Sequence, residues 1–210
     1  MPEPNQPSST DTPLREDAAG PDPILIFRSW YEHAERARLH MPNAMVLATA
    51  TRTGIPSARV VLLKEFDANG FVFFTNYLSR KGAELSDNPN GALLIFWTPL
   101  ERQVRMEGTV EKISEEESDR YFHSRPRVSQ ISAAISEQSL EVESRQELER
   151  RARDLEAHLA GKAVPRPMHW GGYRLRARQI EFWQGRTGRL HDRLLYTLTH
   201  GGWIITRLQP

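Results

Sequence analysis

The chain has 210 residues, of which 39% are hydrophobic and 26% charged, and its 28 basic and 27 acidic residues leave a formal net charge of +1. A chain of this length can bury one sizeable core, so one main domain is expected. The small net charge excludes a broad field that would attract nucleic acid or anionic lipid, and the lack of cysteine excludes disulfides and thiolate chemistry. Any anion must therefore be bound by a local group of side chains.

The N-terminal region predicts neither export nor membrane insertion. Residues 1–21 are rich in Pro, Ser, Asp and Thr, whereas a secretory signal has a basic start and an apolar region. Apolar stretches such as Ala92 to Trp97 fall far short of the roughly 20 residues that span a bilayer. We predict a flexible arm over residues 1–21, one domain over residues 22–210 and a cytoplasmic location.

The first part of the domain predicts a helix followed by strands. Asp22 can cap the helix, Pro23 suits its first turn, and apolar residues at helical spacing carry it to about Met41 and Pro42. A second, brief helix is predicted over residues 79–87. Strands are predicted over 44–51, 57–66, 71–75, 92–97 and 103–113. Five strands in about seventy residues indicate a β-barrel.

The second part predicts helices and then strands again. Ser114 and Glu117 form a capping-box pattern for a helix that ends near Pro126, which opens the next helix. Apolar residues between 148 and 159 predict a longer helix that stops at Gly161. The last strands are predicted over 173–183, 194–199 and 203–208. The predicted fold class is mainly β with helices, an α+β arrangement.

Two cations stand inside an otherwise apolar strand segment. An unpaired charge is costly there, so Arg59 and Lys64 indicate an anion. Residues five apart in a regular strand face opposite sides, so these two cations should meet two anions or two ends of one site unless a bulge intervenes. Strand-end cations that extend into solvent are an equally weighted alternative.

Two further groups could bind an anion. Arg80 and Lys81 begin a helix directly after a strand, where backbone N–H groups are free, although a solvated pair is favoured without further context. Tyr121, Arg125 and Ser129 are spaced four apart. Because Arg125 precedes a proline, they should straddle a junction between two helices. A core tyrosine and a helix-start serine are the alternative.

The densest group of polar and aromatic residues lies between residues 181 and 193. Alternation places Arg189, His191 and Arg193 on one side of a strand, where they would repel each other without an anion or an aromatic plane. Trp183 offers such a plane. An exposed charged turn is the alternative.

Short motifs along the chain, taken together, resemble one family. In order they are RVVLLK, FFTN, SRK, ERQV, YFHSRPRVSQI, EQS, WGGY, IEFWQG, RLHDR and a terminal RLQP. From about Asp22 to Pro210 the chain resembles the pyridoxine/pyridoxamine 5'-phosphate oxidases. The resemblance implies an FMN-binding split β-barrel of antiparallel Greek-key type, flanked by helices, that works as a homodimer with FMN at the subunit interface. No metal, nucleic-acid or membrane partner is predicted.

The same resemblance implies the site residues. FMN would be contacted by Arg59, Val60, Val61, Leu62, Leu63, Lys64, Phe74, Thr75, Arg80, Lys81, Gln103, Gln138, Ser139, Trp183 and Arg193. The substrate would be bound by Lys64, Tyr121, Arg125, Ser129, Arg189, Leu190 and His191. Arg189 and His191 would be the catalytic residues, orienting the reacting carbon and assisting proton movement.

The reaction that the resemblance implies is oxidation of pyridoxamine or pyridoxine 5'-phosphate to pyridoxal 5'-phosphate. A hydride passes from the substrate C4' carbon to flavin N5, the imine formed from the amine is hydrolysed, and O2 reoxidises the flavin with formation of H2O2. Two departures from the family pattern stand out. Arg15 is the one possible remnant of an arginine-and-tyrosine arm segment, and Ser132 replaces a usual glycine. A related oxidase of a phenazine precursor, and a flavin- or pyridoxal-phosphate-binding carrier without turnover, are the alternatives.

Overall fold

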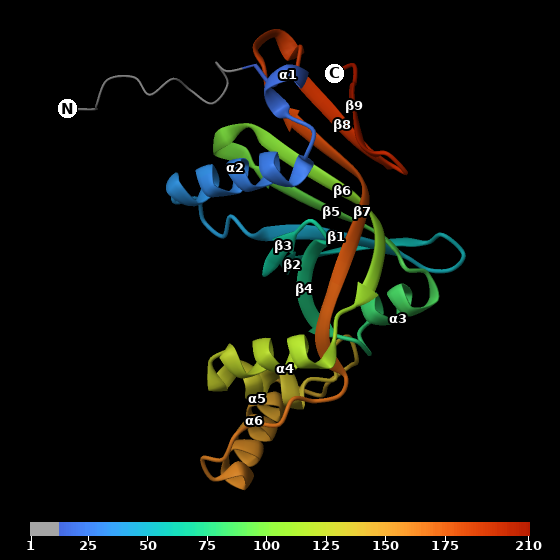
Figure 1. Cartoon of the computed structure of the whole chain (residues 1–210). Coiled ribbons are helices and arrows are strands. Elements are labelled where there is room, and N and C mark those ends of the chain that lie inside the picture. Colours follow the sequence, from blue (N-terminus) through green and yellow to red (C-terminus); the bar gives the residue numbers. More distant parts are fainter. Residues whose placement is uncertain (1–12) are drawn as a thin grey trace, which may run out of the picture.

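The computed structural model describes residues 13–210, and within them nine strands form one curled antiparallel sheet (Figure 1). The strands are β1 (Ala44–Ala50), β2 (Pro56–Leu62), β3 (Glu65–Asp67), β4 (Gly70–Asn76), β5 (Asn90–Trp97), β6 (Arg102–Lys112), β7 (Trp170–Gln184), β8 (Asp192–Thr199) and β9 (Gly202–Arg207). Their order is β2-β1-β5-β6-β7-β4-β3, with β8 paired to β7 and β9 paired to β8.

Strand β7 splits the sheet. One of its edges pairs with β6 along nearly its whole length, whereas the other pairs with β4 over residues 170–175 and with β8 over residues 179–184. A register shift between Glu107 and Gly108 marks a bulge, which bends and twists a strand pair. The sheet therefore divides into two wings. The predicted α+β class, a split antiparallel barrel flanked by helices, is confirmed.

The helices flank the sheet (Figure 1). They are α1 (Glu16–Ala19), α2 (Pro23–Arg36), α3 (Arg80–Asp87), α4 (Glu115–Ser124), α5 (Arg127–Ile135) and α6 (Arg145–Leu159), with 3-10 turns η1 (Thr98–Leu100) and η2 (Thr187–Arg189). Figure 1 shows α4, α5 and α6 gathered at the end far from β8 and β9. Within residues 13–210, the helices are too short or too polar to cross a membrane.

Two apolar clusters hold these parts together. In the larger one, Phe27 of α2 packs edge-on against Phe71 of β4, with 5.0 Å between ring centroids. Trp30 of α2 packs in the same way against Phe182 of β7 at 5.3 Å. In the smaller one, Phe122 of α4 packs edge-on against Trp170 at 5.2 Å. The smaller cluster fixes α4 and α5 against the start of β7 and so positions the residues at their junction.

Two predicted elements end earlier than expected. Helix α2 stops at Arg36 because Arg38 and Met41 adopt positive φ angles of 53° and 49°, which a helix cannot contain. The strand predicted over 57–66 is interrupted after Leu62. There the Leu63 N–H donates to Asn43 O, whereas the Lys64 N–H donates to Val72 O on β4, so the chain changes its pairing partner at this point.

The described part of the predicted N-terminal arm contacts the C-terminal strands. The Leu14 N–H donates to Asp192 Oδ2 at 3.1 Å, and Arg207 forms an ion pair with Glu16 at 2.8 Å. Residues 1–12 lie outside the described residues, so the prediction of a flexible arm there is not tested. The domain boundary at residue 22 stays a prediction.

Candidate active site

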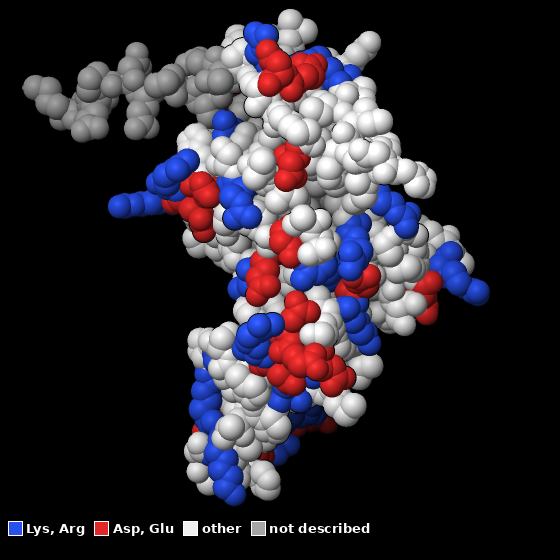
Figure 2. Space-filling view, viewed as in Figure 1, with Lys and Arg blue, Asp and Glu red and all other residues white. Residues whose placement is uncertain are grey.

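A cavity of about 890 Å³ lies between β2, β4, the start of α3 and the junction of α4 with α5. Among the described residues that line it, none is Asp or Glu. Five of them are cations: Arg59, Lys64, Arg80, Lys81 and Arg125. By contrast, basic and acidic side chains are interspersed over the face drawn in Figure 2. The cavity is therefore a local site for anions on a protein of small net charge.

The cavity gathers both cations of the RVVLLK segment, as expected if they belong to one site, although they do not lie on one regular strand. Arg59 and Lys64 both line it. Strand alternation does not relate them, because β2 ends at Leu62 and Lys64 follows the change of pairing partner. Leu63 is the exception in this segment, since its side chain is buried in the main core rather than in the cavity wall.

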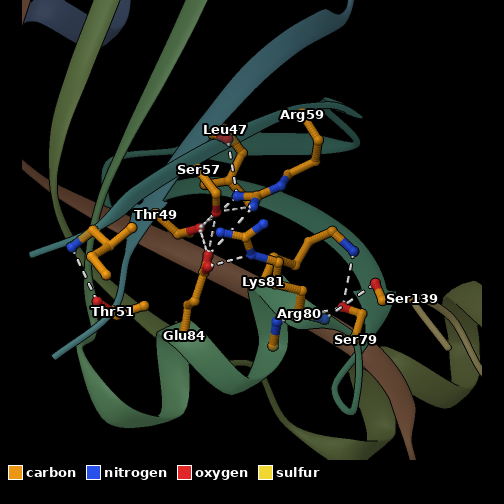
Figure 3. A network of polar contacts seen from close by, with 12 residues as sticks. Leu47, Thr49, Thr51, Ser57, Arg59, Ser79, Arg80, Lys81, Glu84 and Ser139 are labelled. Carbon is orange, nitrogen blue, oxygen red and sulfur yellow. Dashed lines mark hydrogen bonds and ion pairs between the residues drawn. The ribbon is translucent and has the colours of Figure 1, made fainter. Parts of the chain in front are cut away.

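Lys81 is the buried cation of the cavity wall, with 7% of its surface exposed. Its Nζ donates to Thr75 Oγ1, Ser79 Oγ and Gln138 Oε1 at 2.9, 2.9 and 2.6 Å, and these acceptors are all neutral (Figure 3 shows Lys81 beside Ser79). Burial, followed by the nearby charge of Arg59, lowers the pKa of Lys81 to about 8. A buried ammonium group among neutral acceptors is well placed to meet an anion.

Ser139 joins the start of α3 to the loop after α5. Its Oγ accepts a hydrogen bond from the Arg80 N–H at 3.2 Å, and its backbone has a positive φ of 79°. A non-glycine residue in this conformation is strained, and such strain is concentrated at binding sites. The predicted pair Gln138 and Ser139 therefore lies against the predicted pair Arg80 and Lys81.

Three stacked aromatic rings line another part of the cavity. Tyr121 stacks on Phe74 with 3.9 Å between centroids, and Phe74 stacks on Trp170 at 5.4 Å. The Arg125 guanidinium lies 4.6 Å from the Trp170 ring, and Lys64 Nζ lies 5.6 Å from the Tyr121 ring. A cation therefore lies over each end of the stacked rings.

Arg125 carries an unused donor. Its Nη1 is buried and has no hydrogen-bond partner among the described residues, and burial lowers its pKa. It is the C-cap of α4, with an extended backbone before Pro126, and Ser129 lies in the first turn of α5. The predicted junction between two helices is confirmed. An unpaired buried guanidinium nitrogen is costly and favours an anionic ligand.

The remaining predicted residues form a second group, away from this cavity. Gln103 on β6 is in register with Trp183 on β7, which is in register with Arg193 on β8. Directly paired residues share one face of a sheet, so these three side chains form a row. Arg193 Nε donates to the buried Glu181 at 2.8 Å, which raises the pKa of Arg193. None of these residues lines the cavity described above.

The RLHDR segment corrects another expectation. Arg189 belongs to η2 and has a φ of 62°, and β8 begins only at Asp192, so strand alternation does not align Arg189 with His191 and Arg193. His191 lies 4.7 Å from Trp183, and its Nδ1 accepts a hydrogen bond from the Arg186 N–H at 3.1 Å. A neutral imidazole held in this way carries its proton on Nε2. Arg189 and Leu190 are exposed.

Two residues beside the cavity were not identified from the sequence. Trp170 supports Arg125 and Phe74, although the WGGY motif gave no reason to assign it a role. Glu84 forms ion pairs with Arg59 and Arg80. The spacing of four residues between Arg80 and Glu84 was the available indication of such a pair.

The family model described as pyridoxamine 5'-phosphate oxidase matches residues 31–159, more than half of the chain, and the model described as pyridoxine 5'-phosphate oxidase C-terminal dimerisation region matches residues 170–210. The chain belongs to the pyridoxamine 5'-phosphate oxidase family. The predicted family and enzyme class are thereby confirmed, and FMN is the cofactor that goes with this family.

Individual members of the family agree in sequence and in fold. A pyridoxine/pyridoxamine 5'-phosphate oxidase of Rubrobacter xylanophilus is 61% identical over 94% of this chain and 91% of its own length. PhzG of Burkholderia lata, solved with tetrahydrophenazine-1-carboxylic acid, is 35% identical with a TM-score of 0.90 over 96% of this chain and 100% of its own. A related FMN-binding protein of Nostoc punctiforme shares the fold at 16% identity and a TM-score of 0.72, over 90% and 98% of the two chains.

Proposed function

We propose that this oxidase converts pyridoxamine 5'-phosphate and pyridoxine 5'-phosphate to pyridoxal 5'-phosphate with FMN as cofactor, reducing O2 to H2O2. The observation that carries the proposal is the cavity lined by five cations and no described carboxylate. A phosphate monoester carries about −1.5 to −2 charges at neutral pH, so one flavin phosphate and one substrate phosphate together suit this charge.

The cavity fits FMN on its own chemistry. Arg59, Arg80 and the buried Lys81 suit the flavin phosphate, and Gln138 and Ser139 suit neutral hydrogen bonds. The FMN-binding residues in this cavity are Arg59, Val60, Val61, Leu62, Lys64, Phe74, Thr75, Arg80, Lys81, Gln138 and Ser139. Bound FMN would supply the two-electron redox chemistry of the reaction, since the chain has no cysteine pair that could undergo such chemistry.

The other end of the cavity fits the substrate phosphate. Lys64, Tyr121, Arg125 and Ser129 line this end, and the unpaired Arg125 Nη1 is the donor that most needs an acceptor there. These residues bind and orient the substrate, so the substrate must carry an anionic group at this position. A vitamer without phosphate would leave this buried nitrogen without an acceptor.

A second copy of the chain completes the site. The row formed by Gln103, Trp183 and Arg193, with His191 beside it, does not reach the cavity of its own chain. A homodimer that sets this row against the other copy's cavity would bring Arg189, Leu190 and His191 to the substrate ring. The match to a dimerisation region over residues 170–210, which contains most of this row, supports that arrangement.

In that dimer Arg189 and His191 are the catalytic residues. The His191 ring is oriented by the Arg186 N–H and by Trp183, so its Nε2 is free to hold or move a proton near the reacting carbon. Arg189 is exposed and free to reach the substrate. The cytoplasmic location stays a prediction.

An oxidase of a phenazine precursor is the second candidate, because PhzG is 35% identical to this chain and was solved with a tetrahydrophenazine carboxylic acid. Oxygen consumption by FMN-loaded protein distinguishes the candidates. We expect turnover of pyridoxamine 5'-phosphate with formation of pyridoxal 5'-phosphate and H2O2, and little turnover of unphosphorylated pyridoxamine. Turnover of a reduced phenazine carboxylic acid alone would favour the second candidate, and bound FMN without any turnover would favour a carrier.

A further inference from the structure

Glu84 is a buried carboxylate behind the cavity wall. It lies on α3 one turn after Arg80, and its side chain is 5% exposed. Its Oε2 accepts hydrogen bonds from Thr49 Oγ1 and Ser57 Oγ, both at 2.5 Å, and lies 3.4 Å from Arg59 Nη2. Its Oε1 accepts a hydrogen bond from Arg80 Nε at 2.9 Å (Figure 3). Both carboxylate oxygens therefore accept hydrogen bonds.

These contacts keep Glu84 ionised. Burial alone would raise its pKa, but the hydrogen bonds from Ser57, Thr49 and Arg80 outweigh burial and lower the pKa to about 2. Glu84 therefore carries a negative charge at every pH near neutrality. The carboxylate is not among the residues that line the cavity, so it acts on a ligand through its neighbours.

The neighbours of Glu84 are two cations that come from different elements. Arg59 is on β2 and Arg80 is at the start of α3, and both line the cavity. Two guanidinium groups side by side repel each other unless an anion joins them. The Arg59 guanidinium also donates to Leu47 O at 3.2 Å and to Thr49 Oγ1 and Ser57 Oγ at 2.5 Å each, so it is held by several acceptors besides Glu84. The Arg80 side chain is 61% exposed, and in the described residues Glu84 is its one ion-pair partner.

We propose that Glu84 is a positioning residue that joins Arg59 and Arg80 and holds their guanidinium groups toward the phosphate of FMN. The proposal rests on the proposed function, in which these arginines bind that phosphate. Without Glu84, the exposed Arg80 side chain is free to turn into solvent. Binding of the flavin phosphate must then order this side chain, and the lost side-chain entropy weakens the binding free energy. Preorganised donors bind an anion more tightly than mobile ones do.

The positioning effect of Glu84 and its negative charge should change the affinity for FMN in opposite directions, so a measurement of affinity can separate them. A carboxylate next to the arginines reduces the positive potential in the cavity and should weaken phosphate binding if charge alone mattered. Removing it would then tighten FMN binding. Positioning predicts the reverse sign, so the direction of the change in affinity decides between the two roles.

The test is titration of the apoprotein with FMN and with riboflavin, which lacks the phosphate, followed by quenching of flavin fluorescence. We expect Glu84→Ala to weaken FMN binding about tenfold and to leave riboflavin binding unchanged. Glu84→Gln keeps hydrogen-bonding atoms in place and should recover part of the loss. Glu149→Ala is the matched control, because Glu149 pairs with Arg145 at the same spacing on α6 and neither of these two residues lines the cavity.

Three results would overturn the proposal. In the first, FMN binds Glu84→Ala as tightly as it binds wild type, or more tightly. In the second, both flavins are weakened equally, which would indicate a general structural role, and thermal unfolding of each variant would document it. If Glu84→Ala does not fold, Glu84→Gln must show the selective loss of FMN affinity. In the third, wild-type protein fails to prefer FMN over riboflavin, a result that would overturn the proposed phosphate site itself.

Discussion

Lys81 connects burial with the pH dependence of cofactor binding. Its pKa is lowered to about 8 by burial and by Arg59, so in the apoprotein the ammonium group loses its proton as the pH rises through this value. Binding of a phosphate favours the charged form, and FMN binding above pH 8 must therefore take up a proton. We expect FMN affinity to fall as the pH rises from about 8 to about 9.5.

Lys81→Met isolates this effect, because methionine keeps much of the buried stem without a charge. The variant should bind FMN more weakly, and its affinity should no longer change over the same pH range. Titrations at several pH values check this, with the exposed Lys162→Met as a control that keeps the wild-type pH dependence. A pH-dependent loss of affinity that persists in Lys81→Met would assign the titration to another group.

Arg125 should determine the preference for phosphorylated substrate. Arg125→Met keeps an unbranched side chain over Trp170 but removes the buried donor. The KM for pyridoxamine 5'-phosphate should rise roughly 10- to 100-fold, since a hydrogen bond to a charged group contributes about 1.5–3 kcal/mol. Steady-state kinetics with phosphorylated and unphosphorylated amine check this. An equal loss for both substrates would show that Arg125 does not act on the phosphate.

Helix α3 carries its cations to the cavity because it packs very closely on the end of β4. A Cβ atom added at Gly82 would lie 2.0 Å from the backbone oxygen of Tyr77, so one of the two backbones would have to move. Gly82→Ala should therefore cost about 1–3 kcal/mol in the free energy of unfolding and weaken FMN binding, because Arg80 and Lys81 move with the helix.

Denaturant unfolding and FMN titration check the prediction for α3. Gly201→Ala is the matched control, because a Cβ atom there meets nothing closer than Thr199 Oγ1 at 3.9 Å, and both properties should stay near wild type. If Gly82→Ala kept wild-type FMN affinity despite the loss of stability, the position of α3 would not limit cofactor binding.

Local patterns predicted most elements well. The Asp22 cap, the capping box of Ser114 and Glu117, and the junction at Arg125 and Pro126 depend on neighbouring residues in the chain, and the structure has each of them. The break after Leu62 could not be predicted in the same way. It arises because the chain leaves β1 for β4, and that choice depends on residues far away in the sequence.

The candidate site is divided into two groups on one chain, and the sequence alone did not separate them. The cavity uses residues from 57 to 139 and Trp170, whereas the row on β6, β7 and β8 with the RLHDR segment lies elsewhere. Motif order along a chain carries no information on which subunit contributes a residue. The register of β6, β7 and β8 is needed to see that Gln103, Trp183 and Arg193 form a row apart from the cavity.

Subunit complementation tests whether the two groups meet across a dimer. Arg125→Met impairs the cavity and His191→Asn impairs the other group, so each variant alone should have little activity when pyridoxamine 5'-phosphate is kept well below the raised KM of Arg125→Met. In a random mixture of the two chains, about a quarter of the sites would contain neither substitution if each site is shared between subunits. Activity of co-expressed variants should therefore recover to about that fraction. No recovery above the separate variants would place both groups in the same subunit's site.

The most direct measurement is the visible absorption of the FMN-loaded protein when one equivalent of pyridoxamine 5'-phosphate is added without oxygen. We expect the absorption of oxidised flavin to be lost, pyridoxal 5'-phosphate to form in equal amount, and admission of O2 to restore the absorption with release of H2O2. Unphosphorylated pyridoxamine at the same concentration should leave the flavin oxidised. A flavin that stays oxidised with both pyridoxamine 5'-phosphate and pyridoxine 5'-phosphate would contradict the account.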